Sequence, residues 1–248
     1  MAKMTLLEMV QDILSDMSSD EANTITDSLE AMQVARIVES TYFEMMSNKN
    51  WPHLKQLITL NSLSDPATPT HMQMPSNIKE LHTVQYDKIK DGETRKRLTG
   101  IDYVTPDAFL RQTNILNSDN ADVQEVTDLS GVKLLIKNGT APSCYTSFDD
   151  NYIVFDSFDS DVDTTLQSSK TQCTATMSPT FTLEDAHIPD IPVEAFPGLL
   201  AEAKSASFSR IKQAPDGKSE QQSKRQRSWL SRKSWQAGGG MKFPDYGR

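Results

Sequence analysis

The sequence predicts an α+β protein in which N-terminal and C-terminal helices form a helical bundle, with a central antiparallel β domain between them in the chain and an extended C-terminal tail. Apolar residues recur at helical spacing near the N-terminus and again after about residue 190. Between these regions, short runs of alternating apolar and polar residues are separated by proline, glycine and asparagine, as in strands and turns. We therefore divide the chain into a helical region (residues 1–50 and 190–236), a β-rich domain (51–189) and an extended C-terminal docking tail (237–248).

Two helices are expected in the N-terminal region. The second is expected to run from about residue 20 to about residue 47, opened by a capping box between Ser18 and Glu21. Its apolar positions drift around the helix axis, so we expect it to pack on two sides, partly against another subunit. The first is short, and its apolar face consists of Leu6, Val10, Ile13, Leu14 and Met17.

The middle of the chain is expected to form a small antiparallel sheet or a barrel-like β domain. Strands are predicted at residues 54–60, 79–89, 131–137, 152–158 and 172–177. Thr105, Pro106 and Asp107 combine an N-cap, a proline at the first helical position and an acid in the first turn. They predict a short helix through about residue 112.

Helical periodicity returns from about residue 192. Pro215, within Ala214–Gly217, should break or kink the helix, because proline removes a backbone donor and clashes with the preceding turn. A further helical run is expected from about residue 219 to residue 236. The face before the break is made mostly of small residues that allow close helix packing: Leu199, Leu200, Ala203, Ala206, Ser207 and Ile211.

Charge is distributed unevenly along the chain. Residues 202–248 hold eleven Lys/Arg and four Asp/Glu, whereas residues 1–201 hold 14 Lys/Arg and 30 Asp/Glu. The basic end also carries Trp229, Trp235, Phe243 and Tyr246. Three interpretations are open for it: a solvated helix face, a nucleic-acid-binding segment, or a segment that docks on an acidic protein surface. Composition alone does not separate the last two.

The Asp-rich block, residues 156–163, partly matches one metal-binding motif. Asp159, Asp161 and Asp163 match the opening ligands of an EF-hand loop. That loop also needs glycine at its sixth position and glutamate at its twelfth, where this chain has Thr164 and Lys170. We expect a solvated acidic loop, with a weak cation site as the alternative.

No other pattern predicts chemistry. The four histidines, His53, His71, His82 and His187, are scattered without a catalytic or metal-binding motif. Cys144 and Cys173 lack metal-ligand spacing and are expected to be small buried apolar residues. We expect no enzymatic activity, cofactor or metal, and no membrane-spanning helix.

Several passages carry a resemblance to a known family: WPHLKQL, YVTPDAFLRQ, YTSFDDNYIVFDSFDSDVDTTLQ, FPGLLAEAKS and the ending RQRSWLSRKSWQAGGGMKFPDYGR. They resemble the head-to-tail adaptor proteins of short-tailed bacteriophages, the tail tubular protein A type. The similarity covers most of the chain and is strongest from about Trp51 onward. The chain departs from the family at Ala214–Gly217, where related chains continue the C-terminal helix.

The resemblance implies a virion structural protein that is assembled in the host cytoplasm and forms a dodecameric ring beneath the portal. Its implied partners are the portal protein, the tail nozzle and fibre proteins, neighbouring copies of itself, and double-stranded DNA that passes without specific binding. The expected portal interface consists of Trp229, Arg232, Lys233, Trp235, Met241, Lys242, Phe243 and Tyr246. The acidic candidates for lining the channel or facing the tail are Asp149, Asp150, Asp156, Asp159, Asp161 and Asp163.

The alternative from another class is a phage-encoded nucleic-acid-binding protein that uses residues 218–248. Its Lys and Arg side chains would contact phosphates and its tryptophans would stack on bases. A third possibility is a cell-wall-degrading activity, but the sequence contains no evident pair of acids for it.

Overall fold

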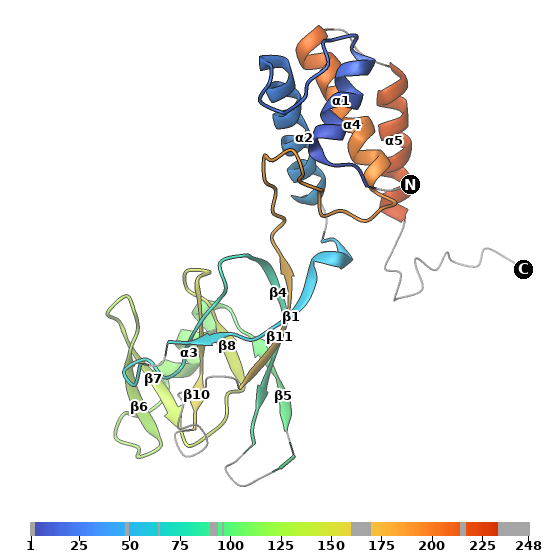
Figure 1. Cartoon of the computed structure of the whole chain (residues 1–248). Helices are drawn as coiled ribbons and strands as arrows, with labels where there is room; N and C mark the ends of the chain where they lie inside the picture. Colours follow the sequence, from blue (N-terminus) through green and yellow to red (C-terminus); the bar gives the residue numbers. More distant parts are fainter. Residues whose placement is uncertain are drawn as a thin grey trace, which may run out of the picture. The chain divides into compact units, whose positions relative to one another are not determined.

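A computed structural model describes residues 3–47, 50–63, 65–89, 94–95, 97–159, 170–213 and 217–232 (Figure 1). Within them the chain has the predicted mixed α+β composition. It divides into two compact units, one formed by Met1–Leu54 with Pro179–Arg248 and the other by Lys55–Ser178. We call them the helical unit and the β unit.

The helical unit contains α1 (Leu6–Asp16), α2 (Leu29–Ser47), a 3₁₀ turn (Pro52–Leu54), α4 (Phe196–Ser207), a π-helical turn (Phe208–Lys212) and α5 (Gly217–Arg232). In its described residues the β unit contains α3 (Pro106–Asn114) and the strands β1 (Lys55–Ile58), β2 (Asn61–Ser62), β3 (His71–Gln73), β4 (Ile78–Asp87), β5 (Leu98–Tyr103), β6 (Val123–Thr127), β7 (Lys133–Asn138), β8 (Cys144–Thr146), β9 (Tyr152–Phe155), β10 (Ser157–Phe158) and β11 (Thr171–Met177).

Helix α1 begins at a reciprocal capping box. The backbone N–H of Thr5 donates to Glu8 Oε2 at 2.8 Å, and the N–H of Glu8 donates to Thr5 Oγ1 at 3.3 Å. Two donors that have no partner inside the helix are satisfied in this way. The predicted apolar face of α1 is confirmed, because Leu6, Val10, Ile13, Leu14 and Met17 are all buried.

The predicted start of the second helix is wrong, since α2 begins at Leu29 instead of about residue 20. Ser18 has a φ of 54° and cannot act as the expected N-cap. Between them the chain turns, with the N–H of Asn23 donating to Asp27 Oδ2 at 3.0 Å. Ser28 Oγ accepts the N–H three residues later at 3.0 Å, so it caps the helix instead. Short polar side chains here bond the backbone locally and compete with helix formation.

The core of the helical unit is built by α1, α2 and α4 together with the segment before α4. Helix α4 contacts α1, α2 and α5. The buried apolar residues include Val34 and Val38 of α2 and Leu199 and Ala203 of α4. Large apolar residues on α2 that remain exposed are Leu29, Met32 and Phe43, so packing of this second side against another subunit stays a prediction.

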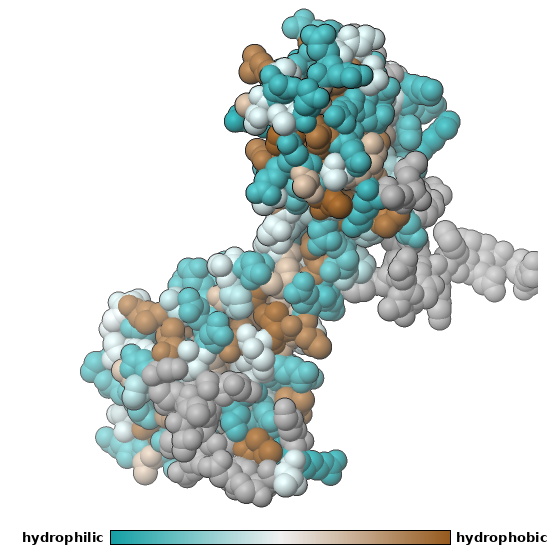
Figure 2. All heavy atoms as spheres, viewed as in Figure 1, coloured by the Kyte–Doolittle hydropathy of each residue, from teal (hydrophilic) through white to brown (hydrophobic). Residues whose placement is uncertain are grey.

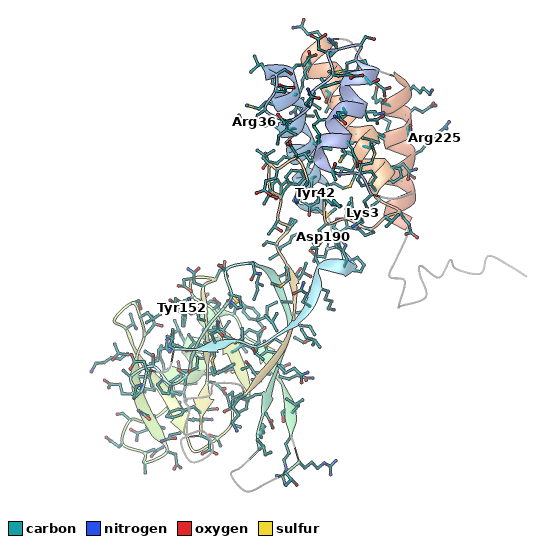
Figure 3. The ribbon with its side chains drawn as sticks, viewed as in Figure 1. Lys3, Arg36, Tyr42, Tyr152, Asp190 and Arg225 are labelled. Atoms are coloured by element: carbon teal, nitrogen blue, oxygen red, sulfur yellow. The ribbon has the colours of Figure 1, made fainter. Side chains whose placement is uncertain are left out.

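Tyr42 fastens α2 to the segment that precedes α4. Its hydroxyl donates to the backbone carbonyl of Asp190 at 3.2 Å, and its ring lies 5.2 Å from that of Phe181 (Figure 3). Burial, with a smaller contribution from the Asp190 charge, raises the pKa of Tyr42 to about 12. The hydroxyl therefore stays protonated and acts as a donor.

The helical region is interrupted after residue 212, as the proline predicts. The π-helical turn ends at Gln213, whose φ of 52° lies in the left-handed region. A new helix, α5, begins at Gly217. Residues 214–216, which include Pro215, lie outside the described residues.

The β unit contains an eight-stranded curled sheet in the order β1-β11-β4-β5-β8-β9-β3-β2 and a three-stranded sheet in the order β10-β7-β6. The prediction of an antiparallel domain is wrong at two places, since β5 pairs with β8 and β10 with β7 in parallel. Parallel neighbours need a long crossover connection. Here α3, β6 and β7 lie between β5 and β8 in the chain, and local alternation does not reveal such a connection.

Most predicted strands exist with shifted ends, and one is divided. Residues 152–158 form β9 in the large sheet and β10 in the small one, separated by Asp156. Asp156 accepts hydrogen bonds from the N–H groups of Ser143 and Cys144 at 2.9 and 3.1 Å. This contact ties the point where the strand changes sheets to the loop before β8.

Helix α3 begins as predicted, with Thr105 at the N-cap and Pro106 in the first turn, although the Thr105 side chain makes no capping bond. Phe109 of α3 is buried in an apolar core together with residues of β7 and β9 such as Leu134 and Val154. A second core, which includes Met72, Tyr86 and Phe155, lies under the large sheet.

Candidate interaction surfaces

Helix α5 is a basic helix, and polar contacts join its residues 217–228 to α4. Among its residues 217–228, only Ser223 is buried. The Ser223 hydroxyl bonds Glu202 of α4, and Arg227 Nη2 donates to Glu202 Oε1 at 2.7 Å. Arg227 also lies 3.7 Å from Glu44 of α2. Glu202 therefore joins this part of α5 to α4 by hydrogen bonds, whereas α1 and α2 are joined by buried apolar side chains.

The outer face of α5 presents cations. Lys224 and Arg225 are exposed, and Arg225 is labelled in Figure 3. Lys224 forms an ion pair with Glu220 at 2.6 Å on the same helix. Such a face can meet carboxylates of a protein or phosphates of a nucleic acid.

The predicted portal-interface residues are placed only in part. Trp229 and Arg232 lie in the last turns of α5, but the description does not extend to their side chains. The other six lie outside the described residues: Lys233, Trp235, Met241, Lys242, Phe243 and Tyr246.

Four of the six acidic candidates are described, and the carboxylates of Asp149 and Asp156 accept backbone hydrogen bonds. Asp149 Oδ1 accepts the N–H groups of Asn151 and Tyr152 at 3.0 and 3.1 Å, and Asp156 bonds the loop before β8. Asp150 is exposed with a φ of 61°, whereas Asp159 is only 7% exposed.

The remaining two acids, Asp161 and Asp163, lie outside the described residues, as does most of the EF-hand-like loop. Within the part of the chain that is described, no cluster of three or more His, Cys, Asp or Glu could hold a metal ion.

An apolar pocket in the β unit is a feature that the sequence did not predict. Its volume is about 500 Å³. Side chains from β3, α3, β7 and β9 and from the turns before β7 and β9 contribute to its wall. The lining consists of Leu110, Leu129, Val132, Leu134, Phe148, Tyr152 and Val154 with the polar residues His71, Asp128, Ser130 and Asp149.

One wall of the pocket is fixed by Asp128. Its Oδ1 lies 2.9 Å from Nε2 of the fully buried His71, and its Oδ2 accepts the Ser130 N–H at 2.9 Å and hydroxyl at 2.5 Å. The serine thus bonds the carboxylate and not the imidazole, so these residues do not have the order of a nucleophilic triad. They attach the turn between β6 and β7 to β3.

In the sequence, His71 is one of four scattered histidines that match no motif. Its partner, Asp128, lies 57 positions away. No local spacing connects the two residues, and only the folded β unit brings them together.

The rim of this pocket exposes large apolar side chains. Leu129, Val132 and Phe148 are 56%, 58% and 41% exposed. Leu129 and Val132 lie in one turn. This turn is closed by the hydrogen bond from the Asp128 N–H to the Val132 carbonyl at 2.7 Å, and its Gly131 has a φ of 84°. Figure 2 shows apolar groups between mainly hydrophilic residues on the surface in view. Large apolar side chains that stand exposed beside a cavity can be buried by a binding partner.

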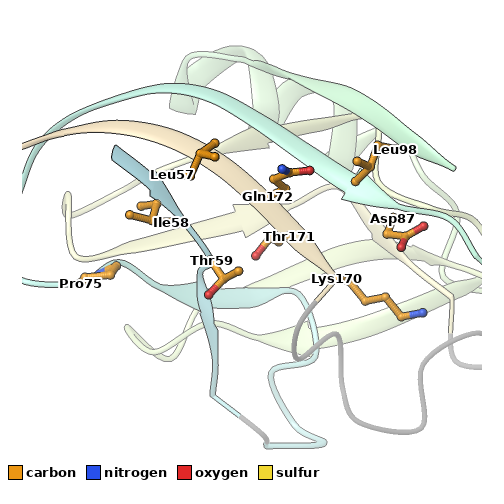
Figure 4. A pocket seen from close by; sticks show the side chains of 9 residues that line it. All are labelled: Leu57, Ile58, Thr59, Pro75, Asp87, Leu98, Lys170, Thr171 and Gln172. Carbon is orange, nitrogen blue, oxygen red and sulfur yellow. The ribbon is translucent and has the colours of Figure 1, made fainter. Parts of the chain in front are cut away.

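A second cavity, of about 540 Å³, lies over the strands β1, β11, β4 and β5 (Figure 4). Leu57 and Leu98 are its exposed apolar residues. Its acid, Asp87, is buried and accepts the N–H groups of Ile89 and Arg97 at 3.1 Å each. Lys170 Nζ donates to the Ile89 carbonyl at 3.3 Å. These charged groups therefore support the local backbone.

Both cysteines are buried and free. Burial is the main cause that raises the pKa of Cys144 to about 11 and of Cys173 to about 12. The thiols are protonated at neutral pH, and protonated thiols are poor nucleophiles and poor metal ligands.

No protein-family model matches this chain, and no curated protein matches it. None of the described helices combines the length and the apolar character required to cross a membrane.

Proposed function

We propose that this chain is a head-to-tail adaptor of a short-tailed bacteriophage. Identical copies would form a ring beneath the portal, extend the DNA channel and provide an attachment surface for the tail nozzle and fibres. The observation that carries the proposal is the basic helix α5, which leads directly into the ending that resembles the family.

The contacts of α5 support a docking role. Its exposed side carries Lys224 and Arg225, while its attachment to α4 depends on Glu202, Ser223 and Arg227. Polar attachments of this kind are exchangeable, because water or another partner can replace each hydrogen bond. An acidic portal surface would compete for the same cations.

The finer architecture belongs to the same proposal. Helices α1, α2, α4 and α5 would be the helical bundle of the adaptor, and the β unit would be its central β domain. The acidic excess of residues 1–201 would repel DNA phosphates, so the genome could pass the ring without binding to it.

Deletion of residues 238–248 tests the adaptor role. This segment supplies Met241, Phe243 and Tyr246 for apolar burial and Lys242 for an acidic partner. The shortened protein should keep the circular dichroism spectrum of the full chain but fail to attach to DNA-filled heads. Normal attachment by this protein, measured by co-sedimentation with the heads, would contradict the docking tail.

Nucleic-acid binding is the second candidate, favoured by the exposed cations of α5. It predicts an affinity for DNA that falls steeply with salt and is weakened by Arg225→Glu. The adaptor proposal predicts weak DNA binding in both proteins and reduced head attachment in the variant. DNA titrations at two salt concentrations therefore separate the two functions.

A further inference from the structure

The apolar pocket of the β unit has the properties of a peptide-binding site. Three large side chains stand exposed around a cavity of about 500 Å³ that is walled by further apolar residues. An occupant would bury both the rim and part of the wall. Because an aromatic side chain buries a large apolar area, one such residue can anchor a short peptide in a cavity of this kind.

The charge of the pocket selects among peptides. Its charged lining residues are Asp128, Asp149 and, when protonated, His71, and no Lys or Arg is among the lining residues. Asp149 uses Oδ1 for the following turn, and its Oδ2 has no partner among the described residues. The next residue, Asp150, is exposed. A complementary occupant places a cation beside a large apolar side chain.

We propose that this pocket binds the chain's own C-terminal segment, residues 241–248. Sixteen residues follow Arg232, the last described residue, and they include Lys242 directly beside Phe243. Phe243 would enter the apolar cavity, and Lys242 would meet Oδ2 of Asp149. Pro244 prevents this segment from continuing as a helix, which suits an extended peptide.

This inference goes beyond the adaptor role and does not depend on it, because it concerns the protein without a portal. Each copy carries one pocket and one such segment, so occupant and site are present in equal amounts. In an adaptor, pocket and portal would compete for the same aromatic residues, and the free protein would keep them covered until it reaches the portal.

Site-specific photocrosslinking in the full-length protein tests the proposal. Phe243 is replaced by p-benzoylphenylalanine, the protein is irradiated, and the crosslinked peptides are identified by mass spectrometry. We expect the main crosslinks to fall within residues 128–134 or 148–154. Crosslinks within one copy or between two copies both satisfy the proposal, because each shows the segment in the pocket.

Matched substitutions show whether the pocket itself is responsible. Val132→Asp, at the 58% exposed rim position, should reduce the crosslink yield about tenfold, and Ile115→Asp, at an 83% exposed position of the same unit, should leave it unchanged. Leu129→Asp serves if the first variant unfolds. Main crosslinks outside the pocket, no crosslinks, or a yield unaffected by the rim variants would overturn the proposal.

Discussion

Asp128 illustrates how one side chain joins distant parts of the β unit. Its carboxylate faces His71 on one oxygen and Ser130 on the other. Burial by itself would raise the pKa of Asp128, but the hydrogen bonds from Ser130 and His71 outweigh this effect and lower it. The ionised form is therefore the one that stabilises the folded protein.

Replacement of this residue gives a pH-dependent prediction. Asp128→Ala should lower the free energy of unfolding at pH 7 by about 1–3 kcal/mol, because the donors of His71 and Ser130 lose their acceptor. A folded-state pKa below the unfolded value means that the stabilisation is complete above about pH 4 and is lost as the pH falls through the folded-state pKa. The difference between the two proteins should therefore shrink below about pH 4 in urea denaturation.

Asp119→Ala is the control for this substitution, because Asp119 is an exposed aspartate of the same unit. It should change stability little at either pH. A difference between wild type and Asp128→Ala that stays constant from neutral to acidic pH would show that the carboxylate charge is not responsible.

At the scale of single elements, α1 and α5 are held to the helical unit by different forces. Helix α1 buries five apolar residues in the shared core, whereas in residues 217–228 of α5 the only buried residue is a serine. Apolar burial scales with area and is insensitive to salt, whereas the contacts of Ser223 and Arg227 in this part of α5 are hydrogen bonds to a charged carboxylate. Helix α5 should therefore be the more easily detached of the two.

Glu202→Gln tests the attachment of α5. The substitution removes the carboxylate charge to which Ser223 and Arg227 are hydrogen-bonded. Hydrogen bonds to charged groups contribute about 1.5–3 kcal/mol. The backbone amides of residues 219–228 should therefore exchange with deuterium about tenfold faster. Glu220→Gln, which breaks only the exposed pair with Lys224, should change exchange far less. Equal rates in both variants would argue against Glu202 as the anchor.

A second pair of substitutions tests the core between helices. Leu199 of α4 is fully buried, so Leu199→Ala should leave a cavity and lower the free energy of unfolding by about 2–5 kcal/mol. Leu29→Ala removes a side chain that is 74% exposed on α2 and should change stability by less than about 0.5 kcal/mol. A large loss at Leu29 in the isolated protein would mean that this residue is already covered by another copy.

For the whole molecule, charge bears on assembly. Residues 1–201 hold 30 acids against 14 basic residues, and like charges oppose the packing of many copies in a ring. If the chain is an adaptor, we expect sedimentation to show a monomer or weak oligomer that becomes a ring only on the portal. A stable ring without the portal would contradict templated assembly and leave the adaptor role itself intact.

The sequence by itself determined the α+β class, the apolar face of α1, the break after the π-helical turn and the start of α3 at Thr105 and Pro106. These features depend on periodicity and capping within a few residues, which the chain order displays directly. The folded chain decided what depends on distant partners. It set the parallel pairing of β5 with β8 and, in the segment before α2, the hydrogen bond from the Ile25 N–H to the Asp185 carboxylate.

The apolar pocket also belongs to what only the tertiary structure decided. Its wall joins His71 to Asp128, and its rim joins the turn before β7 to the turn before β9. Register between strands is set by the packing of whole faces, so residues far apart in the chain become neighbours without any local signal. For the same reason the chain order displays the basic and aromatic ending directly, while the pocket that we propose as its binding site has no signal in the sequence.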